Sequence, residues 1–217
     1  MVRVAGVDGC RGGWVVVHEG GAAVRASFAD VLAALPDDTV VAVDMPIGLA
    51  DEHRPGGRDA DRAARAELGP KRSSVFSAPP RSVLGARSLS EARRRGGRLT
   101  LQTLNLLPRI EDVDRVMTPA LQARVFEVHP ELSFGAMDGG RPVPAPKRTA
   151  EGAKQRLALL ARAGVPVPER PTGAALDDVL DACALTWSAE RIARGDARRV
   201  PDVVAFDRRG LRMDVRW

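Results

Sequence analysis

In the stretch "GVDGCRGGW" (residues 6–14), an apolar run ends in a carboxylate and three glycines follow. The alternating residues of "VRVAGVD" (2–8) predict a strand that ends at Asp8. The glycines predict a turn, and "WVVVHEG" (14–20) predicts a second strand that returns as a hairpin. The chain therefore begins with antiparallel strands.

Outward from this hairpin, the sequence predicts a third strand in "GAAVRASF" (21–28) and a helix in "FADVLAALP" (28–36). The next strand, in "TVVAVDMPIGL" (39–49), also ends in a carboxylate, Asp44. Its continuous apolar character predicts burial on both faces, as at the centre of a sheet.

The rest of the chain is richer in helical patterns. One further strand, at 124–134, carries Glu127 and His129 on one face. Helices are expected at 58–68, about 88–96, 99–116, about 150–163 and 176–195, with a loop at 71–86 and a short hairpin in the C-terminal tail. This order predicts an α/β fold in one domain, residues 1–217. Its mixed sheet has three antiparallel strands plus parallel strands, is flanked by helices, and carries a helical insertion at about 50–120.

Composition narrows the class of protein. With 44% hydrophobic and 28% charged residues the chain is typical of soluble globular proteins, and no segment approaches the roughly 20 apolar residues of a membrane span. Its start lacks the pattern of a secretory signal. Cys10 and Cys183 are the only cysteines, which indicates neither a disulfide framework nor a zinc site. We therefore expect a cytoplasmic protein without membrane association.

The charge balance bears on partners. The 33 basic and 28 acidic residues give a net charge of +5, which is compatible with a polyanionic partner, although the codon usage of a GC-rich genome explains the abundant arginine better. Five Phe, three Trp and no Tyr argue against a platform on which the bases of single strands stack. Binding of nucleic acid would therefore engage its backbone.

Carboxylates recur where a sheet and its last helix present side chains. Asp8 and Asp44 end strands, and strand ends line the clefts of such folds. Three more acids lie in the first turns of the last helix: Asp177, Asp178 and Asp181. Carboxylates brought close together repel one another unless a cation neutralises them, and oxygen ligands suit Mg²⁺ or Mn²⁺. Two such ions, roughly 3.5–4 Å apart, can catalyse phosphodiester cleavage.

Each acid also has an ordinary interpretation. An acid in the first turn of a helix caps it or meets its dipole, for about 0.3–1 kcal/mol. Asp8 before Gly9 is a turn signal, and Asp44 close to Pro46 can be another. The pattern alone leaves both interpretations open.

Five motifs, in this order, resemble the bacterial and archaeal family known as domain of unknown function 429. They are "GVDGCRGGW" (6–14), "VDMPIGL" (43–49), "KRSSVF" (71–76), "EVHPELSF" (127–134) and "DDVLDA" (177–182). The resemblance runs from about residue 3 to 205, and members are described as predicted nucleases with a ribonuclease-H-like fold. It implies a ribonuclease-H-like core with a helical insertion between its fourth and fifth strands.

The resemblance also implies roles for particular acids. In the ribonuclease-H-like superfamily, acids on the first strand, the fourth strand and the last helix bind the metal, which matches Asp8, Asp44 and the pair Asp178 and Asp181. The "DVLDA" segment resembles the D-x-x-D-A of Holliday-junction resolvases and leaves Asp177 as a helix cap or as a residue that supports the metal ligands. That branch usually carries a glutamate on the fourth strand, so Asp44 is one methylene shorter. The acid on the first helix of ribonuclease H has no convincing equivalent.

Other residues are candidates for contacts with the ligand. Glu127 is a candidate third ligand. His129 is a candidate general base or phosphate contact, or alternatively a residue that bonds to the backbone. The loop that carries Arg72, Ser73, Ser74 and Arg81 is a candidate phosphate-binding loop, because guanidinium groups match phosphate oxygens. An ordinary solvated loop explains these residues as well. The candidates for substrate binding are Arg11, Arg72, Ser73, Ser74, Arg81 and Lys147.

The sequence thus predicts a metal-dependent nuclease in which Asp8, Asp44, Asp178 and Asp181 bind one or two Mg²⁺ or Mn²⁺ ions. One alternative is a small-molecule phosphotransferase or ATPase of the actin-like class, in which the turn after Asp8 would cradle phosphates. Against it, no second glycine-rich phosphate loop follows a later strand. The other alternative is a nonenzymatic ribonuclease-H-like scaffold.

Overall fold

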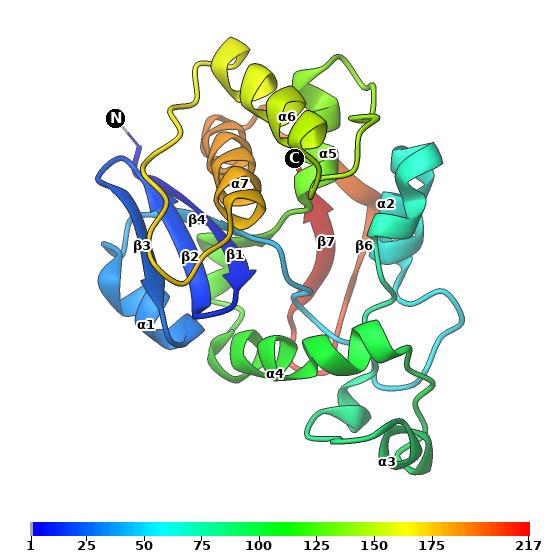
Figure 1. The fold of residues 1–217 in the computed structure, drawn as a ribbon. Helices are drawn as coiled ribbons and strands as arrows, with labels where there is room; N and C mark the ends of the chain where they lie inside the picture. The colour runs from blue at the N-terminus through cyan, green and yellow to red at the C-terminus, as the bar shows by residue number, and fades with distance from the viewer. Residues whose placement is uncertain (1) are drawn as a thin grey trace. The chain divides into compact units, whose positions relative to one another are not determined.

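The computed structural model describes residues 2–217 (Figure 1). The chain forms two compact units. The first unit comprises the residues up to Asp44, Arg124–Arg198 and Arg216–Trp217. The second comprises Met45–Ala123 and Arg199–Val215. The segment of about 50–120 that the sequence predicts as an insertion lies within the second unit.

The first unit contains the predicted mixed sheet. Its five strands follow the spatial order β3-β2-β1-β4-β5, with β1 and β2 antiparallel, β2 and β3 antiparallel, and β1, β4 and β5 parallel. The strands are β1 (Val4–Cys10), β2 (Gly13–His18), β3 (Gly21–Arg25), β4 (Val40–Val43) and β5 (Val125–Glu127). The antiparallel meander and the parallel strands confirm the predicted α/β class with a mixed sheet.

Helices cover both faces of this sheet: α1 (Phe28–Ala34), α5 (Pro130–Met137), α6 (Ala150–Arg162) and α7 (Leu176–Arg194). On one face, Phe28 of α1 packs on Trp14, with ring centroids 5.4 Å apart. On the other face, Val179 and Leu180 of α7 share a buried apolar cluster with Val15 of β2. The long apolar α7 lies over β1 (Figure 1), and α5 and α6 pack against α7 in turn.

The first hairpin turns later than the sequence predicts. β1 continues through Asp8, which pairs with Val15, as far as Cys10, which pairs with Gly13. The turn is therefore only two residues long, and Gly13 (φ 124°) takes the conformation that side chains rarely adopt. Since side chains alternate along a strand, Asp8 shares a face with Cys10, which belongs to the cluster under α7. Asp8 thus faces α7 from within the sheet.

Gly6 sets the distance between α7 and β1. A Cβ atom added to Gly6 would lie 1.9 Å from the Ala182 carbonyl oxygen and 2.5 Å from the Thr186 backbone nitrogen. Only glycine lets the helix backbone approach the strand so closely. The same alternation places Gly6 and Asp8 on one face, so this contact brings the middle of α7 over Asp8.

Two predicted strands are shorter in the structure. β4 ends at Val43, and the chain then bends through Pro46 and Gly48 (φ 75°), which a continuing strand would not accommodate. The prediction of a strand over 124–134 is wrong beyond Glu127, because His129 caps a helix that Pro130 begins. Proline at the first helical position is typical of helix starts, and its ring fixes φ there.

The second unit contains α2 (Asp59–Leu68), α3 (Leu89–Arg94) and α4 (Leu101–Val116), with short 3₁₀ turns at Gly69–Ser74 and Arg81–Val83. The sheet of β6 (Arg199–Phe206) and β7 (Arg212–Arg216) confirms the predicted C-terminal hairpin.

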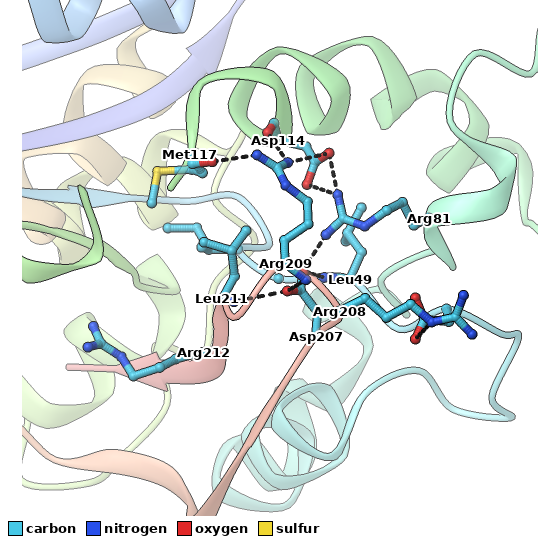
Figure 2. A network of polar contacts seen from close by, with 12 residues as sticks. Leu49, Arg81, Asp114, Met117, Asp207, Arg208, Arg209, Leu211 and Arg212 are labelled. Atoms are coloured by element: carbon cyan, nitrogen blue, oxygen red, sulfur yellow. Dashed lines mark hydrogen bonds and ion pairs between the residues drawn. The ribbon is translucent and has the colours of Figure 1, made fainter. Parts of the chain in front are cut away.

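Buried ion pairs hold the long loops of this unit. Arg58, 1% exposed, pairs with Asp61 and donates to the carbonyls of Ile47 and Gly48. Figure 2 shows a second network, in which Asp207 accepts the backbone N–H groups of Leu49 and Leu211. These bonds replace the regular backbone ladders that the loops lack.

Arg81 lies at the centre of the second network. Its guanidinium pairs with Asp207 and with Asp114 at the end of α4 (Figure 2). Arg209 donates to the carbonyls of Asp114 and Met117, 2.6 and 2.7 Å away. The network therefore joins α4 to the turn between β6 and β7.

No helix among the described residues is both long and apolar enough to span a bilayer.

We predict that Gly6→Ala lowers the free energy of unfolding by about 3 kcal/mol or more, because the added methyl overlaps the backbone of α7. Gly135→Ala is the matched control, since its Cβ would lie 3.8 Å from the nearest atom, in a helix where alanine is favoured. Urea denaturation measures both. Equal stability of the two variants would show that α7 does not rest on Gly6.

We predict that Asp207→Asn destabilises the protein by about 2 kcal/mol or more. The amide oxygen can still accept the Leu211 N–H, but the amide nitrogen then faces the Arg81 guanidinium, and two donors cannot pair. Asp202→Asn, on the exposed surface of β6, is the control. Thermal denaturation that fails to separate the two variants would contradict a structural role for the network.

Candidate functional site

Three carboxylates meet at the carboxyl ends of β1 and β4, in the sheet of the first unit. The backbone N–H of Asp44 bonds to the carbonyl of Val7, 3.1 Å away, so Asp44 follows β4 directly beside Asp8 of β1. Asp181 of α7 is 2% exposed and lies one residue before Ala182, which contacts Gly6. Parallel strands and an overlying helix thus bring together Asp8, Asp44 and Asp181, which are far apart in the sequence.

The carboxylates perturb one another. Burial, and then the charges of Asp44 and Asp181, raise the pKa of Asp8 well above its ordinary value. Burial also raises the pKa of Asp44, and burial together with the Asp44 charge raises the pKa of Asp181 to about 6. A folded chain that keeps several acids with raised pKa values favours a cation beside them.

Lys147 supplies one such cation. Its Nζ lies 2.7 Å from Oδ2 of Asp181, and its charge lowers the pKa values of Asp8 and Asp44. Burial alone would lower the pKa of Lys147, but the charges of Asp181, Asp8 and Asp44 outweigh it and hold that pKa above its ordinary value. The side chain therefore stays an ammonium. The other oxygen of Asp181, Oδ1, is buried and has no hydrogen-bond partner.

The first turn of α7 divides its roles differently from the prediction. Asp178, not Asp177, caps the helix, because its Oδ2 accepts the Ala175 N–H at 2.9 Å. Its charge also raises the pKa of Asp8, so Asp178 borders the cluster. Asp177 instead pairs with Arg148 at 3.5 Å. The helix-capping bond predicted for Asp177 is therefore made by Asp178, which the resemblance implied to be a metal ligand.

His129 lies near the cluster, where a positive charge on its ring would lower the pKa of Asp44. Its Nδ1 accepts the Glu131 N–H at 3.3 Å, which is the bond that caps α5. A neutral imidazole that accepts at Nδ1 carries its proton on Nε2 and donates there. In this arrangement His129 is a hydrogen-bond donor, and a role as general base would require the cap to break.

Glu127 points away from the cluster. It pairs with Val43, which pairs with Val7, and residues paired across neighbouring strands share a face. Val7 and Asp8 are adjacent and therefore face opposite sides of the sheet. The register thus gives Glu127 the face opposite Asp8, although it is buried at the same edge.

The predicted substrate-binding residues fall in both units. Arg11 is exposed in the turn of the first hairpin, three residues beyond Asp8. The second unit holds Arg72, Ser73, Ser74 and Arg81. Of these, Ser74 donates to the carbonyl of Lys71, and Arg81 already pairs with two carboxylates that a phosphate would have to replace. Of the predicted substrate-binding residues, Lys147 is the one that contacts a carboxylate of the cluster.

The sequence analysis missed two residues. Glu131, in the first turn of α5, raises the pKa of Asp44, and its carboxylate pairs with Arg156 of α6. Arg156 is fully buried and lies over the ring of Phe134. The signal was an arginine on the apolar stripe of α6, in register with Leu159 and Leu160. Such an arginine must find a buried partner.

The donors of the cluster suit a hard divalent ion. All are carboxylates, and Oδ1 of Asp181 is buried without a hydrogen-bond partner. Within residues 2–217, however, no three His, Cys, Asp or Glu side chains converge closely enough to enclose an ion as they lie. The positive charge that meets Asp181 in the structure is the ammonium of Lys147.

We predict that Asp8→Asn stabilises the metal-free protein at neutral and higher pH. The amide oxygen can still accept the Gly9 N–H, whereas the buried charge is lost. Since folding raises the pKa of Asp8, ionisation of Asp8 opposes folding increasingly from about pH 4 up to the folded-state pKa.

The expected gain in unfolding free energy is about 1 kcal/mol or more at about pH 8, and it vanishes below about pH 4. Urea denaturation in EDTA across this range measures it, with exposed Glu19→Gln as the control. A gain that is independent of pH would contradict the charge argument.

Comparison with known proteins places this chain in a family. A family model described as "Protein of unknown function (DUF429)" matches residues 6–205, from Gly6 beneath α7 to the middle of the C-terminal hairpin. No curated protein and no solved structure matches the chain. The match covers the whole carboxylate cluster and most of each compact unit. The chain belongs to the DUF429 family.

Proposed function

We propose that the protein is a metal-dependent nuclease with a ribonuclease-H-like fold. The observation that carries the proposal is the convergence of Asp8, Asp44 and Asp181 in one buried cluster whose pKa values are raised. Keeping mutually repelling acids together costs stability, and a site for Mg²⁺ or Mn²⁺ explains that cost.

The sheet supports the same proposal. A three-stranded antiparallel meander followed by two parallel strands on the far side of β1 is the arrangement that the family resemblance implies. The acids also occupy the implied elements: the first strand, the end of the fourth, and the last helix. Asp181 lies deeper in the cluster than Asp178, which makes Asp181 the principal ligand from α7.

The residues of the chain take distinct parts in the proposed reaction. When bound, Mg²⁺ or Mn²⁺ activates water and stabilises charge on the phosphate. Asp8 and Asp181 hold the ion, and Asp44 completes the oxygen ligands from β4. The His129 Nε2–H and the exposed Arg11 donate to phosphate oxygens. DNA and RNA both present the backbone that this set recognises.

The actin-like alternative gains no support from the first hairpin. A phosphate-cradling loop needs backbone N–H groups that point to the ligand. The Gly12 N–H instead donates to the carbonyl of Gly173, 3.1 Å away, and the two glycines pack together. This turn is closed by the chain's own backbone.

We predict that the full-length protein cleaves labelled single-stranded DNA, duplex DNA, RNA or an RNA–DNA hybrid with Mn²⁺, and that EDTA abolishes the cleavage. Asp8→Asn and Asp181→Asn should each lower the rate about 100-fold or more, because each removes a charged oxygen ligand.

Asp177→Asn is the matched control on the same helix, since it removes only a pair with the exposed Arg148. Its rate should stay within about threefold of wild type. Cleavage that Asp8→Asn leaves unchanged on every substrate would refute the nuclease. Absence of both Mn²⁺ binding and cleavage would favour the nonenzymatic scaffold, which keeps the acids without the metal.

A further inference from the structure

Lys147 pairs with Asp181, a buried carboxylate of which only one oxygen has a hydrogen-bond partner. The ammonium binds Oδ2 of Asp181, while Oδ1 of the same group is buried without a partner. The Lys147 ammonium therefore meets the charges of three carboxylates, Arg156 also lowers the pKa of Asp181, and one carboxylate oxygen still lacks a donor. The charge of the cluster is only partly neutralised, and the unpartnered oxygen can accept a divalent cation.

The backbone that carries Lys147 is firmly held. The Pro146 carbonyl accepts both the N–H and the hydroxyl of Thr149, at 3.1 and 2.8 Å. This turn rests on Gly152 of α6, where a Cβ atom would lie 2.0 Å from the Pro146 oxygen. Thr149 also caps α6. The position from which Lys147 reaches the cluster is thus fixed by tight backbone packing.

The backbone of Ala145, two residues before Lys147, is fixed as well. The Ala145 N–H donates to Gln155 and its carbonyl accepts from Arg156, at 3.2 and 3.3 Å. Arg156 itself is buried and pairs with Glu131, so its side chain is held in place. The Lys147 side chain, by contrast, is 38% exposed, so its ammonium can move toward solvent while the backbone stays in place.

We propose that Lys147 is a tethered counter-ion of the carboxylate cluster. A divalent ion displaces its ammonium from Asp181 on binding, so that Lys147 sets the affinity of the site for Mg²⁺ and Mn²⁺. The inference rests on the metal site of the proposed function and adds the residue that competes with the ion. The displaced ammonium stays within reach of the same edge, where it meets the phosphate of a substrate.

The test is titration of the metal-stripped, full-length protein with Mn²⁺, in which electron paramagnetic resonance measures the free ion. Lys147→Met and Lys147→Gln should each bind Mn²⁺ about tenfold more tightly than wild type, because the competing charge is gone. Lys147→Arg keeps a positive charge and should show no such gain. Lys154→Met, on the exposed face of α6, is the matched control and should equal wild type.

The outcomes separate this inference from the proposed function. Binding by Lys147→Met that is equal to or weaker than that of wild type overturns the counter-ion while leaving the nuclease standing. Absence of binding in wild type and in both neutral variants overturns both. Tighter binding without cleavage of any nucleic acid supports the counter-ion and refutes the nuclease. A gain that persists in the double variant Asp8→Asn/Lys147→Met would place the ion elsewhere and overturn the inference.

Discussion

The contact between α7 and β1 at Gly6 is the constraint on which the site depends. Because no side chain separates the two backbones, the helix lies directly on the strand and its inward residues are buried almost without interruption. One of those residues is Asp181, and the next residue after Gly6 on the same face of β1 is Asp8. The packing that stabilises the first unit is therefore the same packing that forces Asp8 and Asp181 together.

The two units show two uses of buried charge. In the second unit, Arg58 with Asp61 and Arg81 with Asp207 are matched pairs that satisfy loop backbone as well as each other. In the first unit the acids outnumber the nearby base, and their pKa values rise in consequence. Matched pairs fit a structural role, whereas an unmatched cluster is the pattern expected where a protein binds a ligand.

Local patterns predicted the meander, the buried central strand and α7, because each depends on periodicity within a short window. The joint placement of Asp8 and Asp44 was predicted because each was expected to end a strand, although β1 continues past Asp8 to Cys10. The end of β5 was missed because His129-Pro130 was assigned to a strand although it starts a helix. The face of Glu127 depends on register with β4, and the pairing of Lys147 with Asp181 joins residues 34 apart. Neither is visible in a local window.

The close contact beneath α7 also limits how sequence length can vary in this family. A helix turns about 100° per residue, so one residue gained or lost between Asp178 and Thr186 would rotate Asp181 away from the sheet or lift the helix off Gly6. The same holds between Gly6 and Asp8, where one residue reverses the face of the acid. Chain length is free to drift in the loops, while these two short segments must keep their spacing.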